Sequence, residues 1–196
     1  MSRILSRLSA RLGGKETLVI GCSFSSVSLT EIMAGTEGRV VCIAVDGSEH
    51  SEKAFDWYKK EIYHQGDRLV VVHSHELHPP ALPHAMATEE WKKEVQKHEK
   101  YIKDLEDKFK SKCEEMQVSA KIIIQGGHPG EHVCKVASKE GATLIVCGSR
   151  GMGTVRRTIL GSTSDYIIHH AHVPVVVVPK EKKHSPHPSP KADKKH

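Results

Sequence analysis

The sequence predicts an α/β protein with an open five-stranded parallel sheet and helices on both faces. Five short apolar runs are continuous rather than alternating and are rich in β-branched residues, which is typical of strands buried on both faces. Each of the first four runs is followed by a helical pattern, so strands and helices alternate along the chain. The alternating segment, residues 39–179, has the usual size of one domain.

The predicted strands are apolar runs of three to six residues: 40–45, 69–72, 122–124, 144–147 and 175–178. Ser48 can cap the first helix, and the second opens near Thr88 with acids in its first turn. An apolar stripe at helical spacing then runs from Trp91 to Met116, which indicates core packing. Pro129 opens the third helix, and Gly161 precedes the fourth.

The two ends of the chain differ from this segment. Residues 1–38 carry arginines at positions 3, 7 and 11, with Ile and Leu between them and no acid before Glu16. That profile fits an amphipathic transit peptide for organelle import; a disordered leader is the alternative, which the Ser/Gly-rich stretch 21–38 favours. The tail, residues 180–196, holds three prolines and no large apolar residue, so we expect it to be disordered.

The charge excess lies mostly outside the alternating segment. The net charge is +5, and the tail alone contributes +4, whereas residues 39–179 carry 19 charges of each sign. A nucleic-acid-binding domain would hold its surplus in the folded part, so this class is excluded. No apolar run approaches the ~20 residues of a membrane span. Five scattered cysteines without a C-x-x-C pair favour reduced thiols in a cytoplasmic protein.

A glycine-rich loop follows the fourth predicted strand. Gly148, Arg150 and Gly151 come directly after the strand, and Gly161 with Ser162 then opens a helix. Glycines let backbone N–H groups approach an anion, and a helix N-terminus favours phosphate. Ligands of open α/β sheets bind beyond the carboxyl ends of the strands. The loop is therefore a candidate phosphate site, with an ordinary tight turn as the alternative.

Other site types find less support in the sequence. The Walker pattern fails at Gly14-Lys15-Glu16, and a dinucleotide fingerprint starting at Gly151 meets Arg156 where its third glycine belongs. Two histidine clusters, at 73–78 and 169–172, lack a carboxylate or cysteine at a known ligand spacing, so no metal site is predicted. Asp46, after the first strand, could accept hydrogen bonds from a ribose or a base; a turn aspartate is the alternative.

Together these segments resemble the universal stress protein family. The sequence has VDGS at 45–48, GHP at 127–129 and the spacing G-x2-G-x9-G-[ST] at 148–162. The closing run VPVVVVP at 173–179 also resembles the last strand of the family. The resemblance covers about residues 39–179, and the leader and tail lie outside it.

The resemblance implies a Rossmann-like fold of the adenine nucleotide alpha hydrolase type and the ATP-binding subclass, with or without Mg²⁺. Asp46 would contact the adenosine, and the glycine loop would hold ribose and phosphates. Ser74 stands where the family often has a valine beside the adenine. The implied nucleotide-binding residues are Ala44, Val45, Asp46, Ser74, Gly148, Arg150, Gly151, Gly161, Ser162 and Thr163.

The resemblance also implies a homodimer through the last strand, from Val173 to Pro179. Three functions fit the sequence. The first is a nucleotide-dependent regulatory module, the second a slow Mg²⁺-dependent ATP hydrolase, and the third a dimeric interaction protein that has lost nucleotide binding. The sequence favours the first, because it shows no separate pair of acids for a metal and no evident catalytic base.

Overall fold

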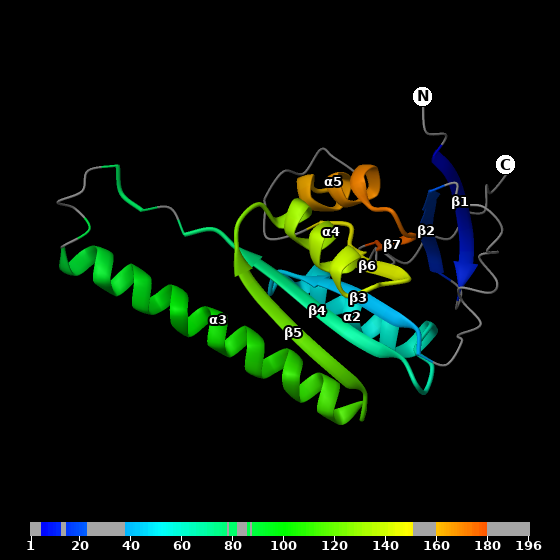
Figure 1. Ribbon diagram of the computed structural model, residues 1–196, viewed down its shortest axis with the longest axis horizontal. Coiled ribbons are helices and arrows are strands. Elements are labelled where there is room, and N and C mark those ends of the chain that lie inside the picture. The colour runs from blue at the N-terminus through cyan, green and yellow to red at the C-terminus, as the bar shows by residue number, and fades with distance from the viewer. Residues whose placement is uncertain are drawn as a thin grey trace, which may run out of the picture.

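The five predicted strands form a parallel sheet. The computed structural model describes residues 5–12, 15–22, 38–77, 79–81, 86, 88–150 and 160–179. The strand order of the sheet is β1-β2-β7-β6-β3-β4-β5, where β1 (Leu5–Leu12) and β2 (Lys15–Cys22) come from the N-terminal segment (Figure 1). Its parallel strands are β3 (Val40–Val45), β4 (Arg68–His75), β5 (Ser119–Gly126), β6 (Leu144–Gly148) and β7 (Val175–Val178). The predicted fold class is therefore confirmed.

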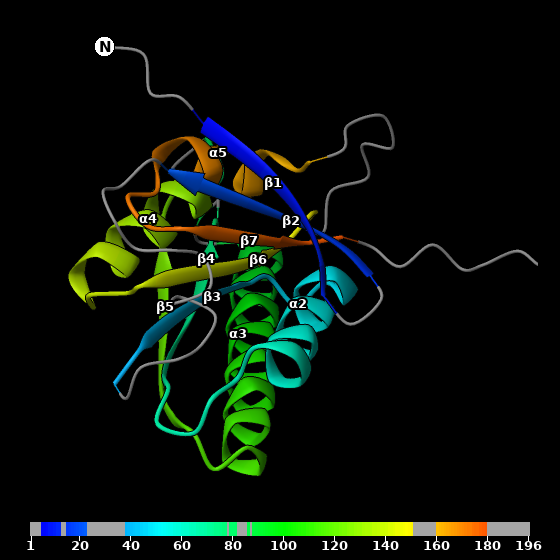
Figure 2. The same ribbon diagram turned by 90° about the vertical axis from the view of Figure 1, so that its right-hand side faces the viewer.

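In the described part of the chain, four helices cover the two faces of this sheet. They are α2 (Glu49–Glu61), α3 (Glu89–Glu115), α4 (Pro129–Lys139) and α5 (Ser162–His170). Helices α2 and α3 lie on one face and α4 and α5 on the other (Figure 2). The predicted cap of α2 is present, because the hydroxyl of Ser48 accepts the N–H of Ser51 at 3.3 Å. Helix α3 begins after Thr88, near the predicted start, and Thr88 is its N-cap.

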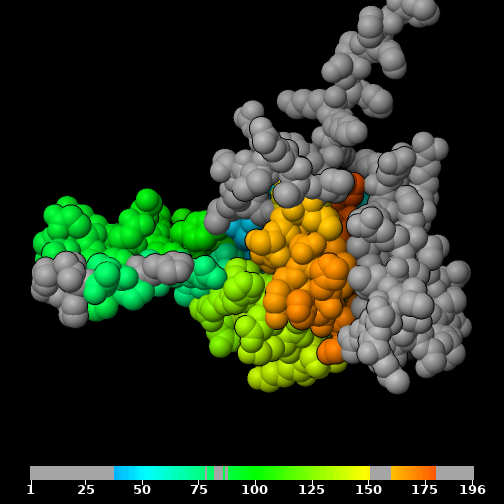
Figure 3. Space-filling model, turned by 90° about the horizontal axis from the view of Figure 1, so that it is seen from above, coloured from blue at the N-terminus to red at the C-terminus, as the bar shows by residue number. Residues whose placement is uncertain are grey.

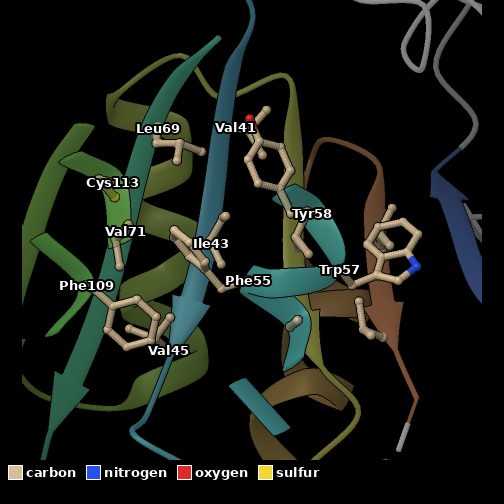
Figure 4. Packing of buried hydrophobic residues seen from close by; sticks show 14 of the residues in the cluster. Val41, Ile43, Val45, Phe55, Trp57, Tyr58, Leu69, Val71, Phe109 and Cys113 are labelled. Carbon is tan, nitrogen blue, oxygen red and sulfur yellow. The ribbon is translucent and has the colours of Figure 1, made fainter. Parts of the chain in front are cut away.

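The strands are apolar on both faces because each face packs against helices. Val41 and Ile43 of β3 contact the core under α2 and α3, whereas Cys42 lies in the core under α4 and α5. On the first face the rings of Phe55 and Phe109 meet edge to face, with centroids 5.4 Å apart (Figure 4). This double burial explains why the sequence runs are continuous rather than alternating.

Helix α3 is longer than the part of the sheet that it covers. Its buried residues, Leu105, Phe109 and Cys113, all lie in its C-terminal half. The N-terminal half projects from the domain (Figures 1 and 3), and Trp91 and Val95 there are only half-buried. The apolar stripe that predicted core packing along the whole helix therefore forms core only in its second half.

A buried ion pair joins the amino ends of β3 and β4. Arg39 donates from Nε to Oδ1 of Asp67 at 2.9 Å and from Nη2 to Oδ2 at 2.6 Å. The Tyr58 hydroxyl and the His64 N–H also donate to Oδ2, at 2.6 and 3.1 Å. Burial raises the pKa of the Asp67 carboxyl, but the hydrogen bonds from Arg39 and Tyr58 outweigh it, and the net pKa lies below its usual value.

The N-terminal segment contains two strands that the sequence did not predict. For residues 1–38 the sequence predicts a transit peptide or a disordered leader. Within this segment the structure has strands β1 (Leu5–Leu12) and β2 (Lys15–Cys22), which pair antiparallel with each other. The Gly13-Gly14 pair between them in the sequence is typical of a hairpin turn. The domain boundaries stay predictions, and residues 23–37 and 180–196 lie outside the described residues.

Strand β2 also pairs antiparallel with β7, with Leu18 opposite Val177 and Ile20 opposite Val175. The last strand is therefore flanked on both sides, by β6 and by β2 (Figure 2). The predicted homodimer requires β7 to be an edge strand, and in this conformation it is not. The physical reason is that an open edge exposes unpaired backbone groups, which the hairpin here satisfies.

Candidate functional site

The candidate site lies at the carboxyl ends of β3 and β6. Strand β3 pairs with β4 on one side and with β6 on the other, and Ala44 lies opposite Cys147 of β6. The chain leaves β3 towards β4, so the boundary between β3 and β6 is the topological switch point of the sheet. The ends of these strands bring the predicted residues Ala44, Val45 and Asp46 next to Gly148.

The turn after β3 is fixed by hydrogen bonds from its own residues and from α3. Oδ1 of Asp46 accepts the backbone N–H of Ser48 at 3.0 Å and its hydroxyl at 2.6 Å. The hydroxyl of Tyr101 donates to the backbone carbonyl of Asp46 at 2.6 Å. Gly47 has φ +74°, and a Cβ there would lie 2.5 Å from the Tyr101 hydroxyl, so the turn requires glycine.

At the end of β6, Gly148 lies against the first turn of α2. A Cβ at this position would be 2.9 Å from the backbone oxygen of His50, a contact too short for any other residue. The two ends of the glycine-rich loop are joined, because the N–H of Gly161 donates to the carbonyl of Ser149 at 2.9 Å. Gly151 lies outside the described residues, so its phosphate contact stays a prediction.

Helix α5 begins at the same edge of the sheet. Its N-cap is Gly161, which has no side chain to bond the first N–H groups of the helix. Ser162 is exposed, and Thr163 and Arg150 are half-buried. The first N–H groups of a helix have no intrahelical acceptor, and they favour a bound anion. The structure thus places Gly148 and Arg150 near Gly161, Ser162 and Thr163, and their binding of phosphates stays a prediction.

Ser74 lies on the other side of the β3 end. Its hydroxyl donates to the carbonyl of Gly127 at 2.7 Å, in the turn between β5 and α4. Along the strand, Ser74 pairs with Gln125 of β5. This hydrogen bond holds the hydroxyl at the turn after β5, and the predicted contact with a base stays a prediction.

Histidines surround the end of β3 on the β4 side. His73 is 3% exposed, and its Nδ1 lies 2.9 Å from the carbonyl oxygen of Val45. Nδ1 of His75 lies 3.0 Å from Nε2 of His98 on α3. Burial lowers the pKa of both His73 and His75, which favours the neutral form of each ring. Among the described residues, no group of three or more His, Cys, Asp or Glu could hold a metal ion.

Tyr101 is a site residue that sequence reasoning missed. It lies four residues before the buried Leu105, so the helical spacing places both on the same side of α3. This spacing could have shown that Tyr101 faces the core, but it does not show which strand the side chain contacts. The contact with Asp46 depends on where α3 crosses β3.

The described cysteines show no sign of a redox site. Cys42, Cys113, Cys134 and Cys147 are all free thiols. Burial raises the pKa of Cys147 to about 12 and that of Cys134 to about 11. Reactive cysteines instead have a lowered pKa, so these side chains act as small apolar residues.

The family model of the universal stress protein family matches residues 38–179 of the chain. The chain belongs to the universal stress protein family. Two curated relatives support this family assignment. The "Universal stress protein in QAH/OAS sulfhydrylase 3'region" of Thermus aquaticus is 31% identical over 144 residues, covering 71% of this chain and 98% of the relative. Universal stress protein YxiE of Bacillus subtilis is 33% identical over 145 residues, covering 69% and 95%.

Solved structures support the fold of this universal stress protein. Protein MJ0577 of Methanocaldococcus jannaschii superposes with a TM-score of 0.63 at 24% identity, covering 74% of this chain and 99% of that one. The Arabidopsis thaliana family protein At3g01520, solved with AMP bound, gives a TM-score of 0.54 at 22% identity over 73% and 92%. Another family member was solved in complex with cAMP. Within the described parts of our chain, no helix is long and apolar enough to cross a membrane.

Proposed function

We propose that this universal stress protein binds ATP at the carboxyl ends of β3 and β6 and acts as a nucleotide-dependent regulatory module in the response to stress. The observation that carries the proposal is the meeting of two features at one edge of the sheet. These are the fixed Asp46 turn and the uncapped N-terminus of α5 at the end of the glycine-rich loop. Two family structures, solved with AMP and with cAMP, support an adenine nucleotide as the ligand.

The phosphate half of the site would be formed by the loop and α5. The N–H groups of Ser162 and Thr163 lie in the first turn of α5, where no cap side chain bonds them. Arg150 adds a positive charge at the start of the loop, and the predicted Gly151 would let the backbone approach the phosphates. Mg²⁺ would arrive bound to the phosphates of ATP, since it is usually held by substrate phosphates and few protein ligands.

The adenosine half would be formed by the end of β3. The Asp46 carboxylate is oriented by Ser48 and can accept a hydrogen bond from a ribose hydroxyl or from a base amino group. Ala44 and Val45 precede it, and Ala44 is half-buried, so an apolar surface is available to the base. Because the two halves bind different parts of the nucleotide, they can be tested separately by the choice of ligand.

A regulatory role fits the described residues better than hydrolysis. Among the described residues, no group of three or more His, Cys, Asp or Glu could hold a metal ion beside Asp46. His73, the nearest buried histidine, bonds the Val45 carbonyl and is kept neutral by burial. We therefore expect slow or no turnover, and a change of conformation or partner affinity as the output.

The test is to purify the protein, extract bound adenine nucleotide and follow its turnover. We expect bound ATP that persists for hours in the wild type and is lost in Gly151→Val. Gly126→Ala is the control for a glycine substitution in the same sheet, because a Cβ there makes an ordinary 3.7 Å contact with His75. Rapid conversion to ADP that Asp46→Ala abolishes would instead make the protein an ATP hydrolase. Failure to bind nucleotide at millimolar ATP would overturn the proposal and leave an interaction protein.

Two further expectations accompany this function. We place the protein in the cytoplasm, because its described thiols are free and its core is built for reduced cysteines. We also retain the homodimer through residues 173–179 as a proposal. That dimer requires the edge of β7 to open, and light scattering at high protein concentration measures it.

A further inference from the structure

A pair of histidines joins α3 to the end of β4, beside the candidate nucleotide site. Nδ1 of His75 lies 3.0 Å from Nε2 of His98, and the two ring centroids are 4.9 Å apart. His98 lies three residues before Tyr101, so the helical spacing places both on the same side of α3. The hydroxyl of Tyr101 donates to the carbonyl of Asp46 at 2.6 Å. Neighbouring turns of α3 are therefore attached to β4 and to the turn after β3.

These two hydrogen bonds lie at the boundary between the packed and the projecting half of α3. Among the described residues, the buried side chains of the helix begin at Leu105, one turn after Tyr101. Trp91 and Val95, on the N-terminal side of His98, are only half-buried. Hydrophobic packing therefore holds the helix from Leu105 onward, and the histidine pair adds a fixed point beyond Tyr101.

The histidine pair forms a hydrogen bond in only some protonation states. A neutral imidazole has one N–H and one bare nitrogen, whereas a protonated ring has two N–H groups. The contact between His75 and His98 needs a proton on only one of the two facing nitrogens, so it forms when both rings are neutral or when one ring is charged. When both rings are charged, two N–H groups of like charge face each other at 3.0 Å, and repulsion replaces the bond.

The groups packed around His75 oppose a second charge on the pair. The ring of His73 stacks on that of His75, with centroids 6.4 Å apart. Burial lowers the pKa of His75, and three histidines lower it further: His98, His73, and His132 of α4. Burial also lowers the pKa of His73 and outweighs the hydrogen bond to Val45 and the charge of Asp46. The buried surroundings of the pair therefore favour neutral rings.

The other charged groups beside the pair are exposed. Glu76 follows His75 in the chain, and Glu94 lies one turn before His98 on α3; both side chains are exposed to solvent. On the β5 side, His75 pairs with Gly126, which carries no titratable group. Exposed charges are screened by water and salt, so these carboxylates compensate little for a second proton on the pair.

We propose that His75 and His98 are positioning residues of the nucleotide site, and that acid releases this part of α3 by placing protons on both rings. At neutral pH their hydrogen bond holds α3 where Tyr101 bonds the Asp46 turn. In acid the two charged rings repel, α3 moves away from β4, and the bond of Tyr101 is lost. The release of α3 stands on its own, whereas its effect on ligand affinity rests on the proposed function.

The test follows the full chain across the pH range in which histidine changes charge, from about pH 8 to about pH 5. Adenosine is the probe, because it has no phosphate whose own protonation would change binding with pH. Release of α3 removes the same hydrogen bond as Tyr101→Phe, so calorimetry should show adenosine binding ~5-fold more weakly in acid. Amide hydrogen exchange should show lower protection factors at residues 98–104 in acid, and unchanged ones at residues 106–113, where the helix is packed.

Two variants keep the contact but prevent the double charge. In His98→Gln the amide nitrogen can take the place of Nε2, donate to His75 and gain no proton. In His75→Asn the amide oxygen can accept from His98 whether or not that ring is charged. We expect both variants to keep adenosine affinity and protection constant across the pH range. His169→Gln is the matched control, because His169 of α5 has a side chain 53% exposed, and it should respond to acid as the wild type does.

Unchanged protection at residues 98–104 of the wild type in acid would overturn the proposal, whatever the ligand does. A full acid response in both His98→Gln and His75→Asn would also overturn it, because other histidines would then carry the response. Loss of protection at residues 106–113 as well would mean general unfolding and would contradict a local release. If α3 is released in the wild type but not in the two variants, and adenosine binds at no pH, the release is confirmed and the proposed function is overturned.

Discussion

Replacing Tyr101 with phenylalanine tests whether α3 positions the nucleotide site. The substitution removes one oxygen, which donates a 2.6 Å hydrogen bond to the Asp46 carbonyl. It keeps the aromatic ring, whose centroid lies 6.1 Å from that of His73. The ring therefore still fills its space. The substitution acts by removing the hydrogen bond that fixes the turn carrying the Asp46 carboxylate.

The expected size of the effect follows from that single bond. A half-buried hydrogen bond contributes ~1 kcal/mol to the free energy of the folded turn. If ligand binding requires that turn, the loss of the bond raises the dissociation constant ~5-fold at 25 °C. The loss should be confined to ligands that contain adenosine, because Asp46 belongs to the adenosine half of the site. We therefore expect ATP and AMP to bind ~5-fold more weakly, and inorganic triphosphate to bind unchanged.

Isothermal titration calorimetry with these three ligands measures the effect. Tyr63→Phe is the matched control, since Tyr63 is also half-buried but lies beyond the C-terminal end of α2 and packs against Tyr58 at a ring distance of 6.0 Å. Equal weakening of AMP and triphosphate would refute the reasoning, because the loss would then reflect general destabilisation. Unchanged AMP affinity would show that Tyr101 does not position Asp46 for the ligand.

Three predictions concern stability rather than binding. Asp67→Ala leaves the buried Arg39 guanidinium without its carboxylate and should lower the free energy of unfolding by ~3–5 kcal/mol in urea titration; a loss below ~1 kcal/mol would contradict a buried pair. Because the folded pKa of Asp67 is lowered, its contribution is present above the unfolded pKa and fades as the pH falls, so stability in acid should decline less steeply in Asp67→Ala. Gly130→Ala places a Cβ 2.7 Å from Cβ of Tyr166 and should cost ~1–3 kcal/mol by thermal unfolding, whereas Gly126→Ala, with a 3.7 Å contact, should not.

The sequence predicted those helices and strands whose local residue pattern is compatible with only one type of secondary structure. The valine-rich run of β3 is continuous because both of its faces are covered, and Ser48 and Thr88 mark helix starts by their own side chains. The meeting of Asp46 and Gly148 also followed, since topology places both at the carboxyl ends of strands and the switch point lies between them.

What the sequence could not predict depends on contacts between distant segments. Tyr101 lies 55 residues from Asp46, and nothing local to either residue indicates their hydrogen bond. The leader has arginines at a spacing that suits a helix and short apolar runs that suit a strand. Its pairing with Val175, Val176 and Val177 depends on a strand that lies 155 to 159 residues further along the chain. The apolar residues from Trp91 to Met116 keep the same helical spacing along the whole helix. The spacing therefore does not show that only the C-terminal half of α3 packs against the sheet.

The projecting half of α3 has a mechanical consequence. From Tyr101 back to Glu89 the helix rises ~18 Å, at ~1.5 Å per residue. The hydrogen bond of Tyr101 to the Asp46 carbonyl holds α3 at one point, and the N-terminal end of the helix projects from the domain (Figure 1). A rotation of α3 about that point therefore displaces its N-terminal end. Each degree of this rotation moves that end by ~0.3 Å. A small displacement of the Asp46 turn thus produces a larger displacement of Trp91, which a change in the fluorescence of its indole ring can report.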